Sequence, residues 1–122
     1  VSQLLKISSA FTPPPPEGFV SPMLWGVESH IVERFGQAGV APENVTMVRD
    51  TFTFVSSNAP DYLIEQFRRF YGPTMNAFEA AEKTGKADEL HRQLLDLAHA
   101  QNRAEDGSTS ISATFMRVTV HR

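Results

Sequence analysis

The chain has 122 residues, of which 41% are hydrophobic and 20% charged, and these values are typical of one small globular domain spanning residues 1–122. The formal net charge of −3 gives no electrostatic reason to expect a nucleic acid or a membrane as partner. The absence of cysteine excludes disulfide scaffolds and cysteine nucleophiles, and it fits a cytoplasmic location.

The first predicted element is a short helix over residues 2–11, where apolar side chains recur at helical spacing. Pro13 ends it, because a residue that precedes proline avoids the α region. Four consecutive prolines, 13–16, then predict a stiff, extended arm. The arm leads to Trp25, the only tryptophan of the chain. Either the arm sets Trp25 at a functional corner, or it is a spacer and Trp25 belongs to the core.

A second helix is predicted over residues 27–38, with Gly39 as its stop. Residues 45–55 are rich in β-branched and aromatic side chains, which predicts a strand. The alternation changes parity in the middle of this strand. A bulge near Arg49 and Asp50, or a strand covered on both faces, explains the change.

The segment 60–83 has a strong helical pattern, and Gly72-Pro73 interrupts it. We therefore expect a kink or two helices there. Another helix is predicted over residues 87–104, followed by a second strand over residues 109–121 that also changes parity.

Two long strands with the same irregularity are expected to pair with each other. The connection between them is too long for a tight hairpin, so chain order alone does not fix the strand direction. The expected fold is α+β, with four to five helices packed on a long antiparallel β ribbon.

Motifs of common enzyme classes are absent from the sequence, including a glycine-rich phosphate loop, the HExxH zinc motif and the GxSxG elbow. No metal site and no catalytic residue is expected within this chain. His91 and His99 are separated by more than two helical turns, so we interpret them as surface or half-buried residues. His30 follows the Trp25 corner and is a candidate base, although an amphipathic helix explains its position equally well.

One group of residues on segment 60–83 allows two interpretations. Its members are apolar or aromatic at helical spacing: Phe67, Phe70, Tyr71, Met75 and Phe78. They either line a ligand pocket or form a core stripe that packs on the ribbon. Tyr71 stands beside Gly72-Pro73, where an irregular backbone favours a functional position.

Several segments together resemble one family. They are "PPPPEGFVSPMLWG", "VESHIVERFG", "TFTFVSSNAPDYLIEQFRRFYGPTMNAFEA" and "FMRVTVHR". They are similar to the C-terminal part of bacterial class I S-adenosylmethionine-dependent methyltransferases, of the type found in ubiquinone and menaquinone biosynthesis. The matching motifs are Ser-Pro-x-x-Trp-Gly and Tyr-Gly-Pro-Thr. Here they correspond to Ser21, Pro22, Trp25, Gly26, Tyr71, Gly72, Pro73 and Thr74.

The resemblance implies methyl transfer from S-adenosylmethionine to a small-molecule acceptor. The family's cofactor site lies in an N-terminal half with an acidic-Gly-x-Gly loop, which this sequence lacks. The resemblance therefore implies a substrate-side fragment of a Rossmann-like fold that binds no cofactor and is inactive alone. The residues expected to contact the acceptor are Phe19, Trp25, Tyr71 and Met75.

The alternative is a non-enzymatic α+β module for binding or dimerisation, with an apolar cleft. In either case a two-stranded ribbon is marginal alone and leaves exposed edges. We therefore expect the chain to associate with itself as a dimer, by edge pairing or by swapping of elements.

Overall fold

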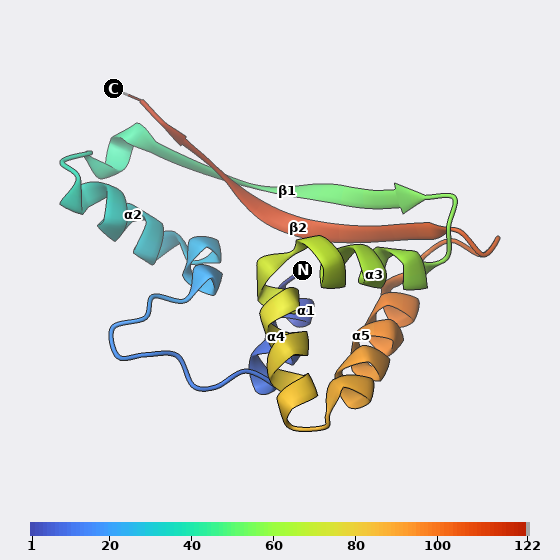
Figure 1. Cartoon of the computed structure of the whole chain (residues 1–122). Coiled ribbons are helices and arrows are strands. Elements are labelled where there is room, and N and C mark those ends of the chain that lie inside the picture. Colours follow the sequence, from blue (N-terminus) through green and yellow to red (C-terminus); the bar gives the residue numbers. More distant parts are fainter. Residues whose placement is uncertain (122) are drawn as a thin grey trace. The chain divides into compact units, whose positions relative to one another are not determined.

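The computed structural model describes residues 1–121, and Figure 1 shows its helices and strands. In chain order the elements are α1 (Ser2–Ala10), the 3-10 helix η1 (Pro22–Gly26), α2 (Glu28–Gln37), the 3-10 helix η2 (Pro42–Asn44), β1 (Val45–Ser56), α3 (Pro60–Phe70), α4 (Gly72–Lys83), α5 (Ala87–Gln101) and β2 (Thr109–Val120). The strands form one antiparallel two-stranded sheet, and the expected α+β class is confirmed. In this described part of the chain, no helix is both long and apolar enough to cross a membrane.

The chain divides into two compact units. Unit 1 comprises Val1–Pro15 and Thr53–Ser112, and unit 2 comprises Pro16–Phe52 and the chain from Ala113 onward. Both strands pass from one unit into the other, so this division does not decide between one domain and two. The expectation of a single domain therefore stays a prediction.

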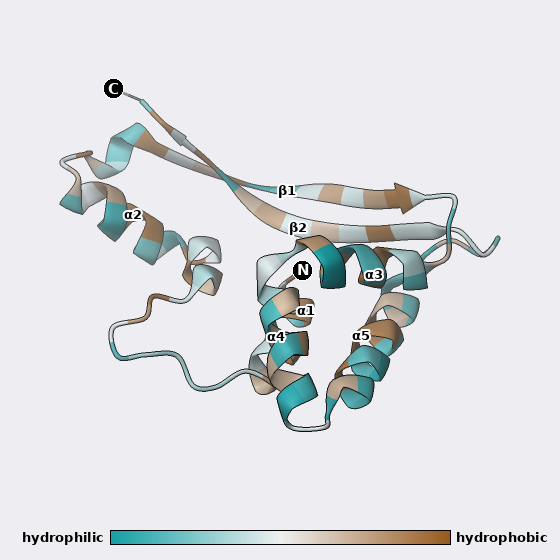
Figure 2. Ribbon diagram, in the orientation of Figure 1, coloured by the Kyte–Doolittle hydropathy of each residue, from teal (hydrophilic) through white to brown (hydrophobic). Residues whose placement is uncertain are grey.

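The core of unit 1 is built by four helices, α1, α3, α4 and α5. Their buried apolar side chains are Leu4, Ile64, Ala77, Phe78, Ala81, Leu90, Leu94 and Ala98. In Figure 2 the hydrophobic residues of α5 lie on its side toward α4. Fully burying a leucine or phenylalanine side chain stabilises a fold by roughly 1.5–3 kcal/mol. This apolar cluster is therefore the main source of stability in unit 1.

The predicted interruption at Gly72-Pro73 is confirmed. Tyr71 adopts an extended conformation (φ −104°, ψ 108°) between α3 and α4, and Pro73 occupies the first turn of α4. Because α3 and α4 are separate helices, apolar residues before and after the break do not lie on one continuous helix face. As a result Phe70 is 70% exposed and Met75 45% exposed. The interpretation of these two residues as part of a core stripe was wrong, whereas Phe78 is buried as expected.

Glycine ends two of the helices, including α2 at the predicted Gly39. Gly39 has φ +81°, and its N–H donates to the Gly36 carbonyl at 2.9 Å. The N–H of Val40 reaches back to the Phe35 carbonyl at 3.0 Å. This is the Schellman pattern, in which a left-handed residue satisfies the last carbonyls of a helix. Gly85, at φ +69°, follows α4 in the same way.

Helix α5 ends at Gln101, three residues before the predicted end at residue 104. The side chain of Asn102 explains the difference. Its Oδ1 accepts from the Ser110 N–H at 2.7 Å, and its Nδ2 donates to the Ser108 carbonyl at 2.8 Å. These bonds replace the next helical turn and hold the loop that begins β2.

The register of the ribbon follows from two contacts. The hydroxyls of Thr53 and Ser112 lie 3.3 Å apart, and the His121 N–H donates to the Asn44 carbonyl at 2.9 Å. The residue numbers in both pairs add to the same value, so one unbroken antiparallel register joins them.

The predicted change of parity is visible in the burial of both strands. On β1 the covered residues are 45 and 47 in unit 2, but 54 and 56 in unit 1. On β2 residues 116, 118 and 120 are covered in unit 2, whereas 109, 111 and 113 are among those covered in the half of the strand nearer α5. One face of the ribbon is therefore covered in unit 2 and the opposite face in unit 1. This explains why apolar residues occur at odd positions in one half of each strand and at even positions in the other half.

Candidate functional site

The four residues expected to contact a methyl acceptor fall into two pairs. Phe19 and Trp25 belong to unit 2, and Tyr71 and Met75 belong to unit 1. Each pair is positioned by its own local structure.

Trp25 is carried by the 3-10 helix η1. Ser21 caps this helix, since its backbone is extended and its Oγ accepts from the Met23 N–H at 3.3 Å. Pro22 takes the first position, where its fixed φ suits a helix and its missing N–H is not needed. The resulting Trp25 side chain is 48% exposed. The alternative in which Trp25 belongs to the core is therefore wrong.

The indole ring of Trp25 is in contact with the last turn of α2. The guanidinium carbon of Arg34 lies 5.2 Å from the centre of the Trp25 ring. Such a cation–π contact is worth about 0.5–1 kcal/mol at an exposed site. His30 lies one turn before Arg34 on α2, so both side chains share one helix face. His30 is exposed, and its Nδ1 lies 3.9 Å from Glu33 Oε2.

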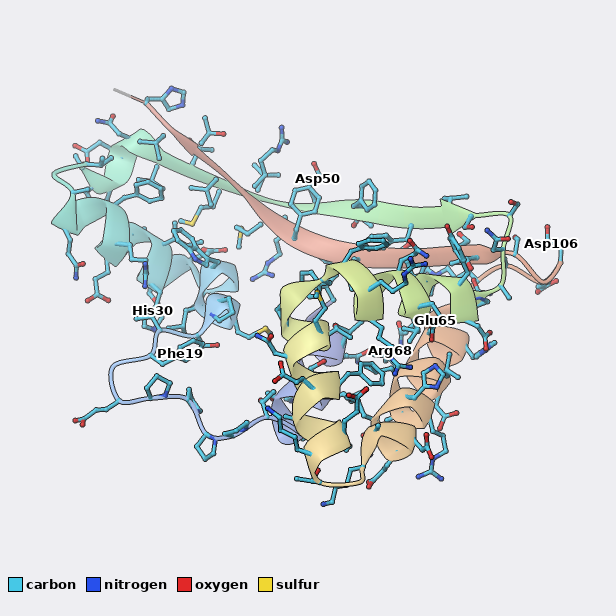
Figure 3. All side chains as sticks on the ribbon, in the orientation of Figure 1. Phe19, His30, Asp50, Glu65, Arg68 and Asp106 are labelled. Carbon is cyan, nitrogen blue, oxygen red and sulfur yellow. The ribbon has the colours of Figure 1, made fainter. Side chains whose placement is uncertain are left out.

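Phe19 belongs to an exposed apolar run that precedes and includes η1. Its N–H donates to the Pro16 carbonyl at 3.1 Å, and Gly18 has φ +79°, so the chain turns at this point. Phe19 is 55% exposed and lies on the connecting segment before α2 (Figure 3). Other exposed apolar residues of the run are Val20, Met23 and Val27.

In unit 1, Tyr71 is partly buried against the core cluster. Its ring meets the edge of Phe67 at 5.2 Å between centroids, and Phe67 in turn meets Phe54 of β1 at 6.0 Å. The Met75 N–H donates to the Tyr71 carbonyl at 2.9 Å. Tyr71 and Met75 are thus one turn apart at the start of α4, with Met75 the more exposed of the two.

A row of polar side-chain pairs joins α3 to α5 and α4, and no sequence motif indicates it. His99 Nε2 lies 2.9 Å from Asp61 Oδ1, and His91 Nε2 lies 3.3 Å from Glu65 Oε1. These histidines are half-buried or exposed, as expected. The two acids are one turn apart, and the two histidines are about two turns apart on the neighbouring helix. The sequence spacing therefore does not show that each histidine pairs with one of the acids, and only the packing of α3 against α5 brings them together.

Arg68 extends this row to α4. Its guanidinium lies 3.5 Å from Glu82 Oε1 and 4.4 Å from the centre of the Phe78 ring. Figure 3 shows Glu65 and Arg68 on α3, on the side toward α5. Among residues 1–121, no group of three histidine, cysteine or acidic residues is arranged to hold a metal ion. The row links α3 to the two neighbouring helices through polar side-chain contacts.

A groove of about 770 Å³ lies in unit 1, between the end of α1, α4 and the start of α5. Its lining residues are Ala10, Phe11, Thr12, Pro13, Asn76, Glu79, Ala80, Lys83, Thr84, Lys86, Glu89 and Gln93. On its wall, Lys83 Nζ donates to Glu79 Oε1 at 2.7 Å. This bond lowers the pKa of Glu79 and raises the pKa of Lys83. Sequence analysis did not identify this groove, because no motif marks it.

Asp106 shapes the turn that leads into β2 and is labelled in Figure 3. Its Oδ1 accepts from the hydroxyl of Ser108 at 2.5 Å and from the Ser108 N–H at 3.0 Å. These two hydrogen bonds favour the ionised carboxylate and lower the pKa of Asp106. The shift has a structural cause and needs no catalytic role.

Comparison with known proteins gave no relative: no protein-family model, no curated protein and no solved structure matches the chain. The candidate site therefore rests on the geometry above. Its most distinctive part is the exposed Trp25 with Arg34 stacked on it, next to the exposed run around Phe19.

Proposed function

We propose that the chain is the acceptor-side part of a cytoplasmic S-adenosylmethionine-dependent methyltransferase that acts on a small molecule. The supporting observation is that three of the four residues that the family resemblance assigns to the acceptor are exposed, whereas Tyr71 is partly buried. Phe19, Trp25 and Met75 are each about half exposed. Large apolar side chains that are not used in the core are available to shape and dry a pocket.

Methyl transfer fits such a surface because the reaction depends on alignment. The acceptor atom, the methyl group and the leaving sulfur must lie in line, and much of the barrier is removed by holding them there. Aromatic side chains such as Trp25 and Phe19 can hold the acceptor in this alignment, and the reaction needs no special nucleophile. In this proposal the cofactor is bound by a part that this sequence does not contain, and the chain alone is inactive.

The β ribbon supports the same proposal. A two-stranded ribbon is marginally stable alone, and its unpaired edges are ready to accept further strands. A chain that completes a larger methyltransferase sheet would have both features. On this view β1 and β2 are the last strands of a sheet whose other strands come from the cofactor-binding part.

The test is Trp25→Ala in a protein that joins this chain to its cofactor-binding part. We expect kcat/KM for the acceptor to fall by about 100-fold, since loss of a positioning wall misaligns the reacting atoms. Phe70→Ala is the matched control, because Phe70 is also an exposed aromatic residue but is not assigned to the acceptor. Equal rates for the wild type and Trp25→Ala would contradict the proposal.

A second candidate is a non-enzymatic binding or dimerisation module. It is favoured by the exposed apolar residues Val48, Phe52 and Phe115 of the ribbon. It is also favoured by an apolar pocket of about 720 Å³ in unit 2, lined in part by Phe35 and Val40. Titration with S-adenosylmethionine of a protein that includes the sequence upstream of Val1 separates the candidates. Saturable binding favours the methyltransferase, and no binding favours the module.

A further inference from the structure

We propose that Trp25 and Arg34 form a binding site for planar aromatic carboxylates. The aromatic ring of the ligand rests on the exposed indole, and its carboxylate accepts hydrogen bonds from the guanidinium. This inference rests on the proposed function, because it names the chemical class of the methyl acceptor. It adds Arg34, which neither the sequence motifs nor the family resemblance had singled out.

The guanidinium of Arg34 is held beside the indole ring of Trp25. Arg34 is exposed on the last turn of α2 and lies 5.2 Å from the centre of the Trp25 ring. Stacking on the indole restricts the side chain before any ligand arrives. Less conformational entropy is then lost when a ligand binds, and this preorganisation favours affinity.

Arg34 has no anionic partner among the described residues. Among residues 1–121, no carboxylate lies within ion-pair distance of Arg34, and no side chain accepts a hydrogen bond from it. Its neighbour Glu33 is directed to His30 instead, at 3.9 Å. The donors of Arg34 are thus free for a ligand, and the planar guanidinium fits a carboxylate through two parallel hydrogen bonds.

The charge and the apolar surroundings of Arg34 indicate the class of ligand. One guanidinium compensates one negative charge, which suits a monoanionic carboxylate better than a dianionic phosphate. The exposed indole and the exposed run with Phe19 and Met23 suit an aromatic ring rather than a polar body, because aromatic groups pair with aromatic side chains in stacked or edge-to-face geometry. A cation next to an aromatic wall therefore recognises an arene that carries a carboxylate.

In the part of the chain that the structure describes, Arg68 and Arg69 also contact aromatic rings, and both differ from Arg34. Arg68 lies over Phe78 but is already paired with Glu82. Arg69 lies over Phe70 at 5.2 Å, the same distance as in the Arg34 contact. Its ring is a phenyl group, which attracts cations less strongly than indole. Arg69 is therefore a matched control for the loss of an exposed, ring-stacked arginine.

The test uses the chain itself and nuclear magnetic resonance. Trp25 is the only tryptophan, so its indole N–H gives one signal that reports the site directly. Three probes are titrated: benzoate, its neutral analogue benzamide, and cyclohexanecarboxylate, which keeps the charge but lacks the planar ring. We expect benzoate to move the indole signal with a dissociation constant about tenfold lower than either analogue gives, because charge-assisted hydrogen bonds and stacking act together.

The variants assign the effect to its residues. In Arg34→Gln the tenfold preference for benzoate over benzamide should disappear, whereas Arg69→Gln should keep it. The full amide spectrum shows whether each variant remains folded. The proposal is overturned if benzoate leaves the indole signal unmoved, if the wild type binds benzoate and benzamide equally, or if Arg34→Gln retains the preference.

These titrations contain no methyl donor, so they separate this inference from the proposed function. If benzoate binds but the joined protein methylates no aromatic acid, the carboxylate site at Trp25 and Arg34 is supported, and its role as the acceptor site is contradicted. If the joined protein transfers a methyl group but benzoate does not bind, the methyltransferase proposal is supported and the carboxylate site is overturned.

Discussion

Thr74 and Thr109 are both fully buried in unit 1, yet their hydroxyl groups have opposite environments. The hydroxyl of Thr109 donates to the Asn58 carbonyl at 2.8 Å. The hydroxyl of Thr74 has no partner among the described residues. A buried polar group costs free energy unless it is hydrogen-bonded. The two residues therefore offer a direct measurement of that cost within one fold.

We predict that Thr74→Val leaves the free energy of unfolding unchanged or raises it by about 1 kcal/mol, because valine has the same shape without the unpaired hydroxyl. Thr109→Val should lower it by about 1–3 kcal/mol, since it leaves the Asn58 carbonyl without its donor. Urea unfolding of both variants measures these values. A loss of stability in Thr74→Val as large as in Thr109→Val would show that the Thr74 hydroxyl has a partner in solution.

At the candidate site, features that depend on contacts between distant residues could not be predicted from the sequence. The 3-10 helix η1 that carries Trp25 was not predicted, although its Ser21 cap and Pro22 start act through local backbone chemistry. The contact of Trp25 with Arg34 was not predicted either, since a cation–π contact between η1 and α2 depends on tertiary packing. The same holds for the pairing of His99 with Asp61, which are far apart in the chain.

At the scale of elements, both strands and the helical segments were predicted, because each has a clear apolar period or strand composition. For residues 60–83 the prediction left open a kink or two helices, and the structure has two, α3 and α4. The errors arose where a local contact outweighs that period. The hydrogen bonds of Asn102 end α5 early. The break at Tyr71 changes which side chains of α3 and α4 face the core, and it leaves Phe70 and Met75 exposed.

The end of α2 gives a prediction at this scale. Gly39 has φ +81°, where an L side chain is strained, whereas Gly36 lies inside the helix with open space where a methyl group would lie. Gly39→Ala should therefore lower the free energy of unfolding by about 1 kcal/mol. Gly36→Ala should raise it by up to about 1 kcal/mol, because alanine favours helix.

Thermal unfolding followed by circular dichroism compares the two glycine variants in one experiment. Because both changes add the same methyl group, they differ only in backbone conformation. Midpoints that shift in the same direction would mean that the left-handed C-cap does not determine where α2 ends.

At the scale of the whole molecule, the two-stranded ribbon has edges that no other strand of residues 1–121 covers. The His121 N–H bonds to the Asn44 carbonyl, so residues of even number on β1 direct their backbone groups to β2 in this register, and those of odd number direct theirs to the open side. On that side, the Thr51 N–H donates a hydrogen bond to the Asp50 carboxylate at 2.8 Å. This contact protects one position of the edge, and the N–H of Arg49 is directed to the same open side.

We therefore predict that the chain forms dimers by pairing β1 edges, and that Arg49→Pro prevents this. Proline removes the outward N–H of Arg49 while it leaves the hydrogen bonds to β2 in place, as proline does on edge strands. Arg49→Thr is the matched control, because it removes the charge but keeps the N–H. Light scattering over a range of concentrations should give dimer mass for the wild type and Arg49→Thr, and monomer mass for Arg49→Pro. A wild-type chain that remains monomeric at high concentration would show that the open edge is not a site of self-association.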